Sequence, residues 1–393
     1  MGELIPGLPE EVARECLVRV GFDQLPVVRR ISRQWKSEVE SPDYHRQRRA
    51  EGLARPVLAL VQAQPTAPPA DDGAGGPVDK HSTAAGSGGP ANSYRMVLLD
   101  PVEGRWAPLP PLPWPSESLP LFCQVAAVDG GGGQGQGRKR LVVVGGWHPE
   151  TWAPTDAVFV YDFLTGAWRR GAPMPGPRRS FFACAAVGGA VYVAGGHDDE
   201  KNALRSALAY DPEADAWAQL PDMAEERDEP RGLCAAAGGS SRFLVVGGYP
   251  TQAQGRFVGS AECFDPATST WAPVDLMIED GVCPRTCCAA PGPGPSERMY
   301  MLSRDGNLVA RDGAASASAW RPVAQVPEDA RTAATVSAIP DGRVVVIGSG
   351  CHGGDQTVYV LREEPGKGAS SWTRAPAPPE FSGHVQASCF LEI

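Results

Sequence analysis

The chain has 393 residues, is rich in glycine (46) and proline (39), and carries a formal net charge of −10 at pH 7. This acidic balance argues against nucleic acid as a partner, and ten cysteines in this length are too sparse for a disulfide-stapled secreted domain. Because neither a signal peptide nor an apolar run long enough to span a bilayer is evident, we expect a soluble protein of the cytoplasm or nucleus, with no membrane partner.

The first fifty residues show helical periodicity and lack the repeat that follows. Apolar side chains recur at i, i+3 and i+4 in residues 8–20 and again in 24–42, and a basic stretch at 42–52 ends in a glycine. The pattern predicts three helices within residues 3–50. A unit of this size has a small core and is expected to need a partner surface.

Residues 56–393 are built on a repeat of about 50 residues. Strand-like runs close in paired glycines at Gly145, Gly195 and Gly247. The same period separates six tryptophans, Trp106, Trp168, Trp217, Trp271, Trp320 and Trp372. Repeats of this length with four short strands are typical of propeller blades. The spacing predicts a mainly β, six-bladed propeller in which each indole is buried between neighbouring blades.

The first blade has no innermost strand upstream of it in the sequence. The C-terminal run 384–393 is predicted to supply that strand beside residues 56–63, which joins the two ends of the propeller and leaves few open edges. Between them, residues 64–92 contain almost no large apolar side chain. That composition predicts a disordered insertion within the closing blade.

Histidines at the strand ends raise the question of a metal site. His148, His197 and His352 follow the glycine-rich strand ends, and His384 begins the closing strand. Four imidazoles on one face are a conceivable ligand set. Propeller loops do not converge on one coordination shell without dedicated insertions, however, so solvent-facing loop residues are the favoured interpretation. We therefore expect no metal and no other cofactor.

Arginines open four innermost strands, at Arg179, Arg231, Arg285 and Arg331. The intervals from Arg179 to Gly195 and from Arg231 to Gly247 are both 16 residues, so these two arginines are interpreted as equivalent. Two roles stay open for each: a fork that binds partner carboxylates, or a brace between loops. The same face supplies further substrate-binding candidates, namely His148, His197, Asp198, Asp199, Tyr249 and Arg304.

The cluster Asp198, Asp199 and Glu200 follows the second glycine-ended strand and resembles a set of metal ligands or an acid/base pair. Its place in the repeat puts it in a crossover loop on the arginine face. We expect it to form the rim of a protein-binding surface, paired either with Arg179 and Arg231 or with basic residues of a partner.

The N-terminal unit resembles an F-box, through Leu8-Pro9 with acidic residues after it and Trp35 late in the second helix. F-box helices bind the Skp-type adaptor of a cullin ubiquitin ligase. The resemblance implies adaptor contacts at Leu8, Pro9, Leu17 and Val20, while Trp35 holds the helices together. The alternative is a short helical cap that packs on the propeller.

The repeat resembles the kelch motif, and an F-box followed by kelch repeats resembles the plant F-box/kelch-repeat proteins. The strings ELIPGLPEEVARECL, RPVLALVQA and SFFACAAVGGAVYVAGGHDDEKNALRSALAYD look most like the subfamily that delivers phenylalanine ammonia-lyase or type-B cytokinin response regulators to the proteasome. The resemblance implies a non-catalytic substrate receptor of a Skp–cullin–F-box (SCF) ligase. Blades five and six depart from the pattern, with SRDG and GSG in place of paired glycines. A propeller scaffold without a ligase role and a metal-dependent propeller enzyme are the alternatives.

Overall fold

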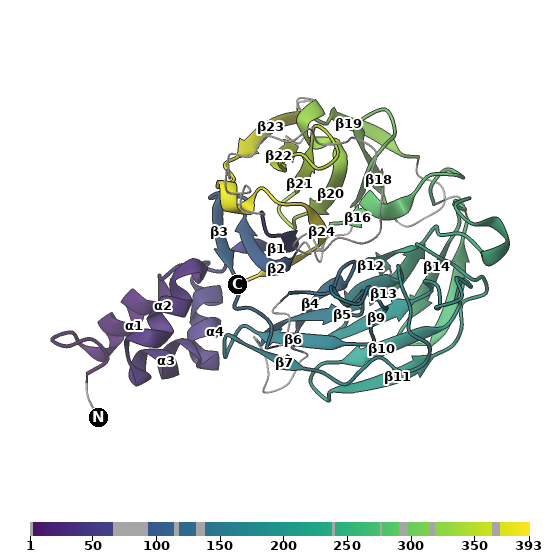
Figure 1. The fold of residues 1–393 in the computed structure, drawn as a ribbon. Coiled ribbons are helices and arrows are strands. Elements are labelled where there is room, and N and C mark those ends of the chain that lie inside the picture. The colour runs from purple at the N-terminus through teal and green to yellow at the C-terminus, as the bar shows by residue number, and fades with distance from the viewer. Residues whose placement is uncertain are drawn as a thin grey trace, which may run out of the picture.

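The computed structural model describes residues 3–65, 93–113, 118–130, 138–237, 240–275, 277–290, 298–313, 319–363 and 370–393. Within these ranges, four α-helices precede six four-stranded antiparallel sheets. The sheets surround a common axis, and the helices lie to one side (Figure 1). The predicted six-bladed propeller with an N-terminal helical unit is therefore confirmed. Apart from residues 64 and 65, the insertion predicted at 64–92 lies outside the described residues.

The helical unit contains four helices where the sequence pattern predicts three. They are α1 (Glu10–Val18), α2 (Leu25–Ile31), α3 (Arg33–Val39) and α4 (Pro42–Ala50). The expected second helix is interrupted at Ser32, whose backbone is extended (φ −155°, ψ 162°). The Ser32 hydroxyl accepts a hydrogen bond from the Trp35 backbone N–H at 3.1 Å. Serine thus acts as the N-cap of α3, and the prediction of one continuous helix is wrong. None of the helices in the described ranges has the length and apolar composition to cross a bilayer.

The helical unit has its own small core. Leu17 and Tyr44 are almost fully buried in it, and the Tyr44 hydroxyl donates to the Leu17 carbonyl at 3.1 Å. The Trp35 indole N–H donates to the Leu4 carbonyl at 2.6 Å, which ties α3 to the segment before α1. The contact agrees with the expected role of Trp35 in holding the helices together.

Each blade runs outward from an innermost strand. The first three blades are β24 (Val385–Glu392), β1 (Pro56–Ala63), β2 (Tyr94–Asp100) and β3 (Arg105–Pro108); β4 (Gln124–Asp129), β5 (Lys139–Val144), β6 (Val158–Asp162) and β7 (Ala167–Arg170); and β8 (Ala183–Val187), β9 (Ala190–Ala194), β10 (Ala207–Asp211) and β11 (Ala216–Leu220). The first blade therefore combines the two ends of the propeller, with β24 paired antiparallel to β1.

The remaining blades repeat this order, although β16 is only two residues long. They are β12 (Arg231–Ala237), β13 (Ser240–Val246), β14 (Ala261–Asp265) and β15 (Thr270–Val274); β16 (Cys288–Ala289), β17 (Arg298–Leu302), β18 (Asn307–Asp312) and β19 (Arg321–Gln325); and β20 (Thr332–Ala338), β21 (Arg343–Ser349), β22 (Thr357–Glu363) and β23 (Ser370–Ala375). In such a sheet the innermost strand begins at the end where the second strand stops. We call this end of the propeller the mouth face and the opposite end the turn face.

The six periodic tryptophans join each blade to the blade before it. Every indole N–H donates to a backbone carbonyl of the preceding blade at 2.7 to 2.9 Å. The pairs are Trp106–Pro376, Trp168–Pro110, Trp217–Ala172, Trp271–Pro221, Trp320–Met277 and Trp372–Gln325. All six side chains are half-buried, not fully buried as predicted, because they lie at the outer edge of the blades.

The helical unit packs on the turn face. Arg29 of α2 donates to the carbonyl of Phe163, in the turn between β6 and β7, at 2.9 Å. Phe22, between α1 and α2, is 5% exposed and belongs to the hydrophobic core of the first two blades. An ion pair joins Asp23 to Arg105 of β3 at 3.5 Å. These contacts position the helices at the end of the propeller opposite the mouth face.

Candidate functional site

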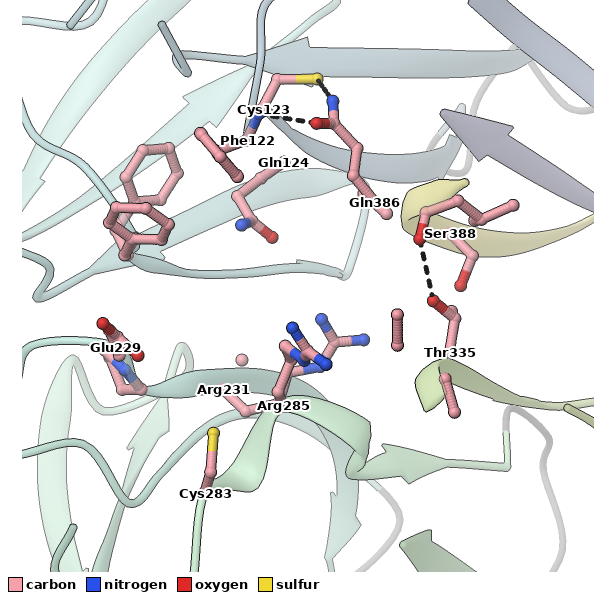
Figure 2. A pocket seen from close by; sticks show the side chains of 18 of the residues that line it. Phe122, Cys123, Gln124, Glu229, Arg231, Cys283, Arg285, Thr335, Gln386 and Ser388 are labelled. Atoms are coloured by element: carbon pink, nitrogen blue, oxygen red, sulfur yellow. Dashed lines mark hydrogen bonds between the residues drawn. The ribbon is translucent and has the colours of Figure 1, made fainter. Parts of the chain in front are cut away.

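A cavity of about 220 Å³ opens at the mouth face, and residues from all six blades line it. We call it the mouth cavity. The side chains that distinguish its wall chemically are Phe122, Phe181, Glu229, Arg231, Arg285 and His384. Figure 2 shows the side chains of Arg231 and Arg285 reaching the middle of the cavity, with Glu229 at one edge.

Two of the four predicted arginines therefore line the mouth cavity. The Arg231 Nε donates to the Cys287 carbonyl at 3.1 Å, which fixes the side chain and leaves its terminal nitrogens toward the cavity. Arg285 is exposed, and its guanidinium has no hydrogen bond or ion pair with any residue that the structure describes. Both groups are thus available to an anion that enters from the mouth face.

Arg179 takes the second of the two roles left open, a brace between loops, and is not available as a substrate-binding residue. It is 1% exposed, and its Nη1 donates to the carbonyls of Gly195 and Ser206 at 3.1 and 3.0 Å. Its Nη2 donates to the Ser206 hydroxyl at 2.9 Å. Burial lowers the pKa of this guanidinium to about 10. Arg179 braces the connection between β9 and β10 and is closed to a partner.

The structural counterpart of Arg179 is Arg227, and the predicted equivalence with Arg231 is wrong. Arg227 donates to the Gly247 and Ser260 carbonyls at 2.8 and 3.1 Å and to the Ser260 hydroxyl at 3.0 Å. The segment from Arg227 to Gly247 is 20 residues, four longer than in the preceding blade, and this insertion misled the spacing argument. The sequence does mark the correct equivalence, because a serine directly precedes the third strand in both blades, at Ser206 and Ser260.

Arg331 and Arg304 lie outside the mouth cavity. The Arg331 Nε donates to the Val326 carbonyl at 2.7 Å, and Nη1 lies 3.9 Å from the Glu328 carboxylate. The exposed Arg304 donates to the Gly281 carbonyl. Both arginines are therefore held by backbone carbonyls of the propeller, outside the mouth cavity.

His148 and His197, which were predicted for the binding site, instead hold loops in place through hydrogen bonds. His148 Nδ1 accepts from the backbone N–H groups of Glu150 and Thr151 at 3.2 and 3.4 Å. His197 is buried, with Nδ1 2.8 Å from Asp228 Oδ1 and Nε2 2.8 Å from the Lys201 ammonium. Over the described ranges, no group of three or more His, Cys, Asp or Glu side chains has a geometry that could hold a metal ion.

The acidic cluster binds its own loop. Asp198 Oδ1 accepts from the backbone N–H groups of Glu200 and Asn202 at 3.0 and 2.9 Å, whereas Asp199 is exposed. The predicted pairing of this cluster with Arg179 is wrong, because Asp198 caps its own turn and Arg179 is buried against backbone carbonyls. Tyr249 is 8% exposed, and its hydroxyl donates to Glu229 Oε1 at 3.0 Å, at the edge of the mouth cavity.

Aromatic side chains beside the cavity form a feature that the sequence analysis missed. The ring centroids of Phe122 lie 5.4 Å from Trp147 and 5.3 Å from Phe181, and those of Trp147 and Trp152 are 6.5 Å apart. We call these four residues the aromatic rim. Phe122 is 42% and Trp152 60% exposed. The Lys201 ammonium lies 5.6 Å from the Trp147 ring and adds a positive charge beside the rim.

Three members of the aromatic rim have backbones in the left-handed region. The φ angles of Phe122, Trp152 and Phe181 are 55°, 55° and 52°. Side chains with a Cβ adopt this conformation at a cost of about 1–2 kcal/mol. Glu229 and Ala333 have the same conformation, with φ angles of 51° and 50°, at the corresponding place where two other innermost strands begin, so for Phe122 and Phe181 it is a feature of the repeat.

The helical unit presents a separate apolar surface. Of the predicted adaptor contacts, Leu8 is 37% exposed, Pro9 is exposed and Val20 is half-buried. Leu17 is 2% exposed and packs in the core beneath α4, which corrects its expected role as a contact. The sequence analysis missed three exposed apolar residues on α1 and α2, which are Val12, Val27 and Ile31.

Comparison with known proteins gives matches over both parts of the chain. The F-box domain family matches residues 5–47, and the Kelch motif matches residues 137–175 and 178–224. The F-box/kelch-repeat protein At1g80440 of Arabidopsis thaliana is 39% identical over 401 residues, which cover 100% of both chains. The F-box/kelch-repeat protein At1g15670 of the same plant is 38% identical over 395 residues, again with full coverage of both.

Two further matches are partial. The Arabidopsis thaliana F-box/kelch-repeat protein SKIP20 is 40% identical over 292 residues, which cover 70% of this chain and 67% of SKIP20. Among solved structures, that of YjhT aligns with 68% of this chain and 85% of its own, at 15% identity and a TM-score of 0.47. This last similarity is too weak to bear on function.

Proposed function

Because the chain belongs to the plant F-box/kelch-repeat family, whose members are generally substrate adaptors of SCF ubiquitin ligases, we propose that it recruits one defined target for ubiquitination and proteasomal degradation. The target we propose is phenylalanine ammonia-lyase or a type-B cytokinin response regulator. Recognition of these targets would place the protein in the control of phenylpropanoid biosynthesis or of cytokinin signalling, in the cytoplasm or nucleus. The support for this choice is the similarity of the strings at 3–17, 55–63 and 180–211 to the subfamily with those targets.

One observation carries the proposal: the two candidate contact surfaces lie on different faces of one body. The helical unit packs on the turn face through Arg29 and Phe22, while the mouth cavity and aromatic rim lie on the mouth face. An adaptor bound to the helices therefore leaves the mouth face open. Holding a target there raises the effective concentration of its lysines near the ligase, so the protein itself need not make or break a bond.

The adaptor side of the proposal rests on exposed apolar residues. Leu8 precedes α1 and Val12 lies in its first turn, and both are exposed, while Val27 and Ile31 are exposed four residues apart on α2. At this spacing, Val27 and Ile31 share one face of α2. Exposed apolar residues grouped in this way mark a protein interface, which here suits a Skp-type adaptor that in turn binds a cullin.

The experiment that tests the target compares protein turnover in plant cells that lack or overproduce the chain. We expect the half-life of phenylalanine ammonia-lyase or of a type-B response regulator to lengthen on depletion, and its ubiquitinated form to accumulate with a proteasome inhibitor. Unchanged half-lives of both would refute the proposed targets. A scaffold without a ligase role would fail to co-purify the adaptor and cullin, and a metalloenzyme would contain stoichiometric metal by elemental analysis.

A further inference from the structure

We infer that the mouth cavity recognises a short acidic segment of the target, with a target carboxylate bound between Arg231 and Arg285. A neighbouring aromatic or large aliphatic side chain of the same segment packs on Phe122 and Phe181 of the aromatic rim. This inference rests on the proposed function for the existence of a target. It adds the chemistry by which the target is recognised.

The charges of the mouth cavity favour a carboxylate. A guanidinium offers paired N–H donors that match the two oxygens of a carboxylate, and Arg285 makes no contact of this kind with any described residue. Burial and the nearby Arg285 lower the pKa of His384, so this imidazole is neutral at pH 7. Glu229 is the acidic residue in the wall, and it is held at the edge by the Tyr249 hydroxyl.

The presence of Glu229 also separates a carboxylate from a phosphate. Two arginines against one glutamate leave a single net positive charge among the ionised groups of the cavity wall. One carboxylate balances that charge, whereas a phosphorylated side chain carries about −1.5 to −2 charges at pH 7. The local balance is opposite in sign to the chain as a whole, whose net charge is −10. The mouth cavity is therefore a local exception on an acidic protein.

The aromatic rim supplies the second half of the recognition. Phe122 and Phe181 line the cavity and also belong to the rim, so a side chain that packs on them is next to the arginines. Phe122 is 42% exposed. Its ring contacts those of Trp147 and Phe181, which hold it at the wall of the cavity. Aromatic and arginine side chains are the residues that dominate binding energy at protein interfaces.

The mouth cavity, with a volume of about 220 Å³, has room for an inserted side chain. The cavity opens at the mouth face, and its wall continues into the aromatic rim. A peptide can lie across this surface and insert one acidic side chain, while the next apolar side chain stays on the rim.

The experiment uses the full chain in complex with its Skp-type adaptor to select from a phage-displayed library of random short peptides. We expect enriched peptides to share Asp or Glu within a few positions of Phe, Trp, Leu or Ile. A synthetic enriched peptide should bind about tenfold more weakly when its acid is replaced by the amide. Enrichment of basic or purely apolar motifs, or the absence of any enriched motif, would contradict the inference.

Variants of the chain identify which residues recognise the acidic position of the peptide and which recognise its apolar position. Arg285→Gln should weaken the acidic peptide about tenfold and abolish its advantage over the amide peptide. Phe181→Ala should reduce the preference for the apolar position and keep the preference for the acid. Arg205→Gln is the matched control, because Arg205 lies on the mouth face with 63% of its side chain exposed and outside the cavity.

Three outcomes would overturn the inference: equal effects of Arg285→Gln and the control, tighter binding of the phosphoserine version of the peptide, or retained binding in Arg285→Gln and Phe181→Ala alike. Melting temperatures of all variants show that they are folded. The peptide measurement needs no ubiquitin transfer. If the peptide selection succeeds and the proposed targets fail, the recognition chemistry is supported and only the target identities are refuted. If the targets are confirmed and the peptide selection fails, only the recognition chemistry is refuted.

Discussion

The buried pair Arg227–Glu262 offers a quantitative test of how the blades are held together. The two side chains are 2% and 4% exposed, and Arg227 Nε lies 3.2 Å from Glu262 Oε1. Glu262 also accepts from the Ala224 backbone N–H at 2.7 Å. In the preceding blade, Leu208 occupies the place of Glu262 in the third strand, and the buried Arg179 has no ion pair with any described carboxylate. Glu262→Leu therefore makes one blade resemble its neighbour.

We expect Glu262→Leu to lower the free energy of unfolding by about 3–5 kcal/mol, since removing one partner of a buried pair leaves the other charge uncompensated. The lower end applies if the three hydrogen bonds from Arg227 to Gly247 and Ser260 survive. The double variant Arg227→Met/Glu262→Leu removes the unpaired charge together with the donors to Gly247 and Ser260, so its stability relative to Glu262→Leu measures the net cost of the uncompensated guanidinium.

Urea unfolding followed by tryptophan fluorescence measures these differences, and the midpoint of thermal unfolding should fall by about 5–10 °C in Glu262→Leu. Glu262→Gln keeps the size and the acceptor oxygen and serves as the matched control, with a smaller expected loss. If Glu262→Leu is as stable as the wild type, the pair contributes no net stability and the argument from burial is refuted.

Three further changes test the blade contacts, the packing of the helical unit and its pH dependence. Trp217→Phe removes the hydrogen bond to the Ala172 carbonyl and should cost about 1 kcal/mol in urea unfolding; a loss above 3 kcal/mol would mean that the half-buried indole acts as a core residue. Arg29→Ala removes the donor to the Phe163 carbonyl and should increase amide hydrogen exchange in residues 25–31 without changing exchange in β12–β15; equal increases in both regions would contradict a local contact. Burial lowers the pKa of His45 from 6.5 to about 4, so the unfolded state takes up a proton first as the pH falls. Stability should be constant above pH 6.5 and decrease between pH 6.5 and 4, and His45→Gln should flatten that decrease; an unchanged pH profile in this variant would exclude His45 as its source.

The propeller was predictable because each blade repeats the same physical solution. A tryptophan recurs where its N–H reaches the carbonyl of the preceding blade, so the period in the sequence reports the blade count directly. The depth of these indoles was not predictable, because burial at the outer edge depends on the neighbouring turn. The break at Ser32 was missed for a related reason. Its neighbours keep helical spacing, and only the cap geometry ends α2.

The candidate site was predictable in part. Arg231 and Arg285 line the mouth cavity as the sequence suggested, but Arg179 looked identical to them in sequence and is buried. The direction of an arginine depends on whether a serine and two carbonyls lie within its reach, which spacing along the chain does not reveal. Phe122 and Phe181 come from different blades and meet only in the folded structure, so no local sequence pattern predicts the aromatic rim.

The central claim is that one chain links an adaptor to a target through two separate surfaces. Quantitative mass spectrometry of proteins co-purified from proteasome-inhibited plant cells tests it most directly. Leu8→Ala/Pro9→Ala should lose the Skp-type adaptor and cullin and retain the target, while Arg285→Gln should lose the target and retain the adaptor and cullin. Loss of both partners in either folded variant, or of neither in the first, would contradict the account.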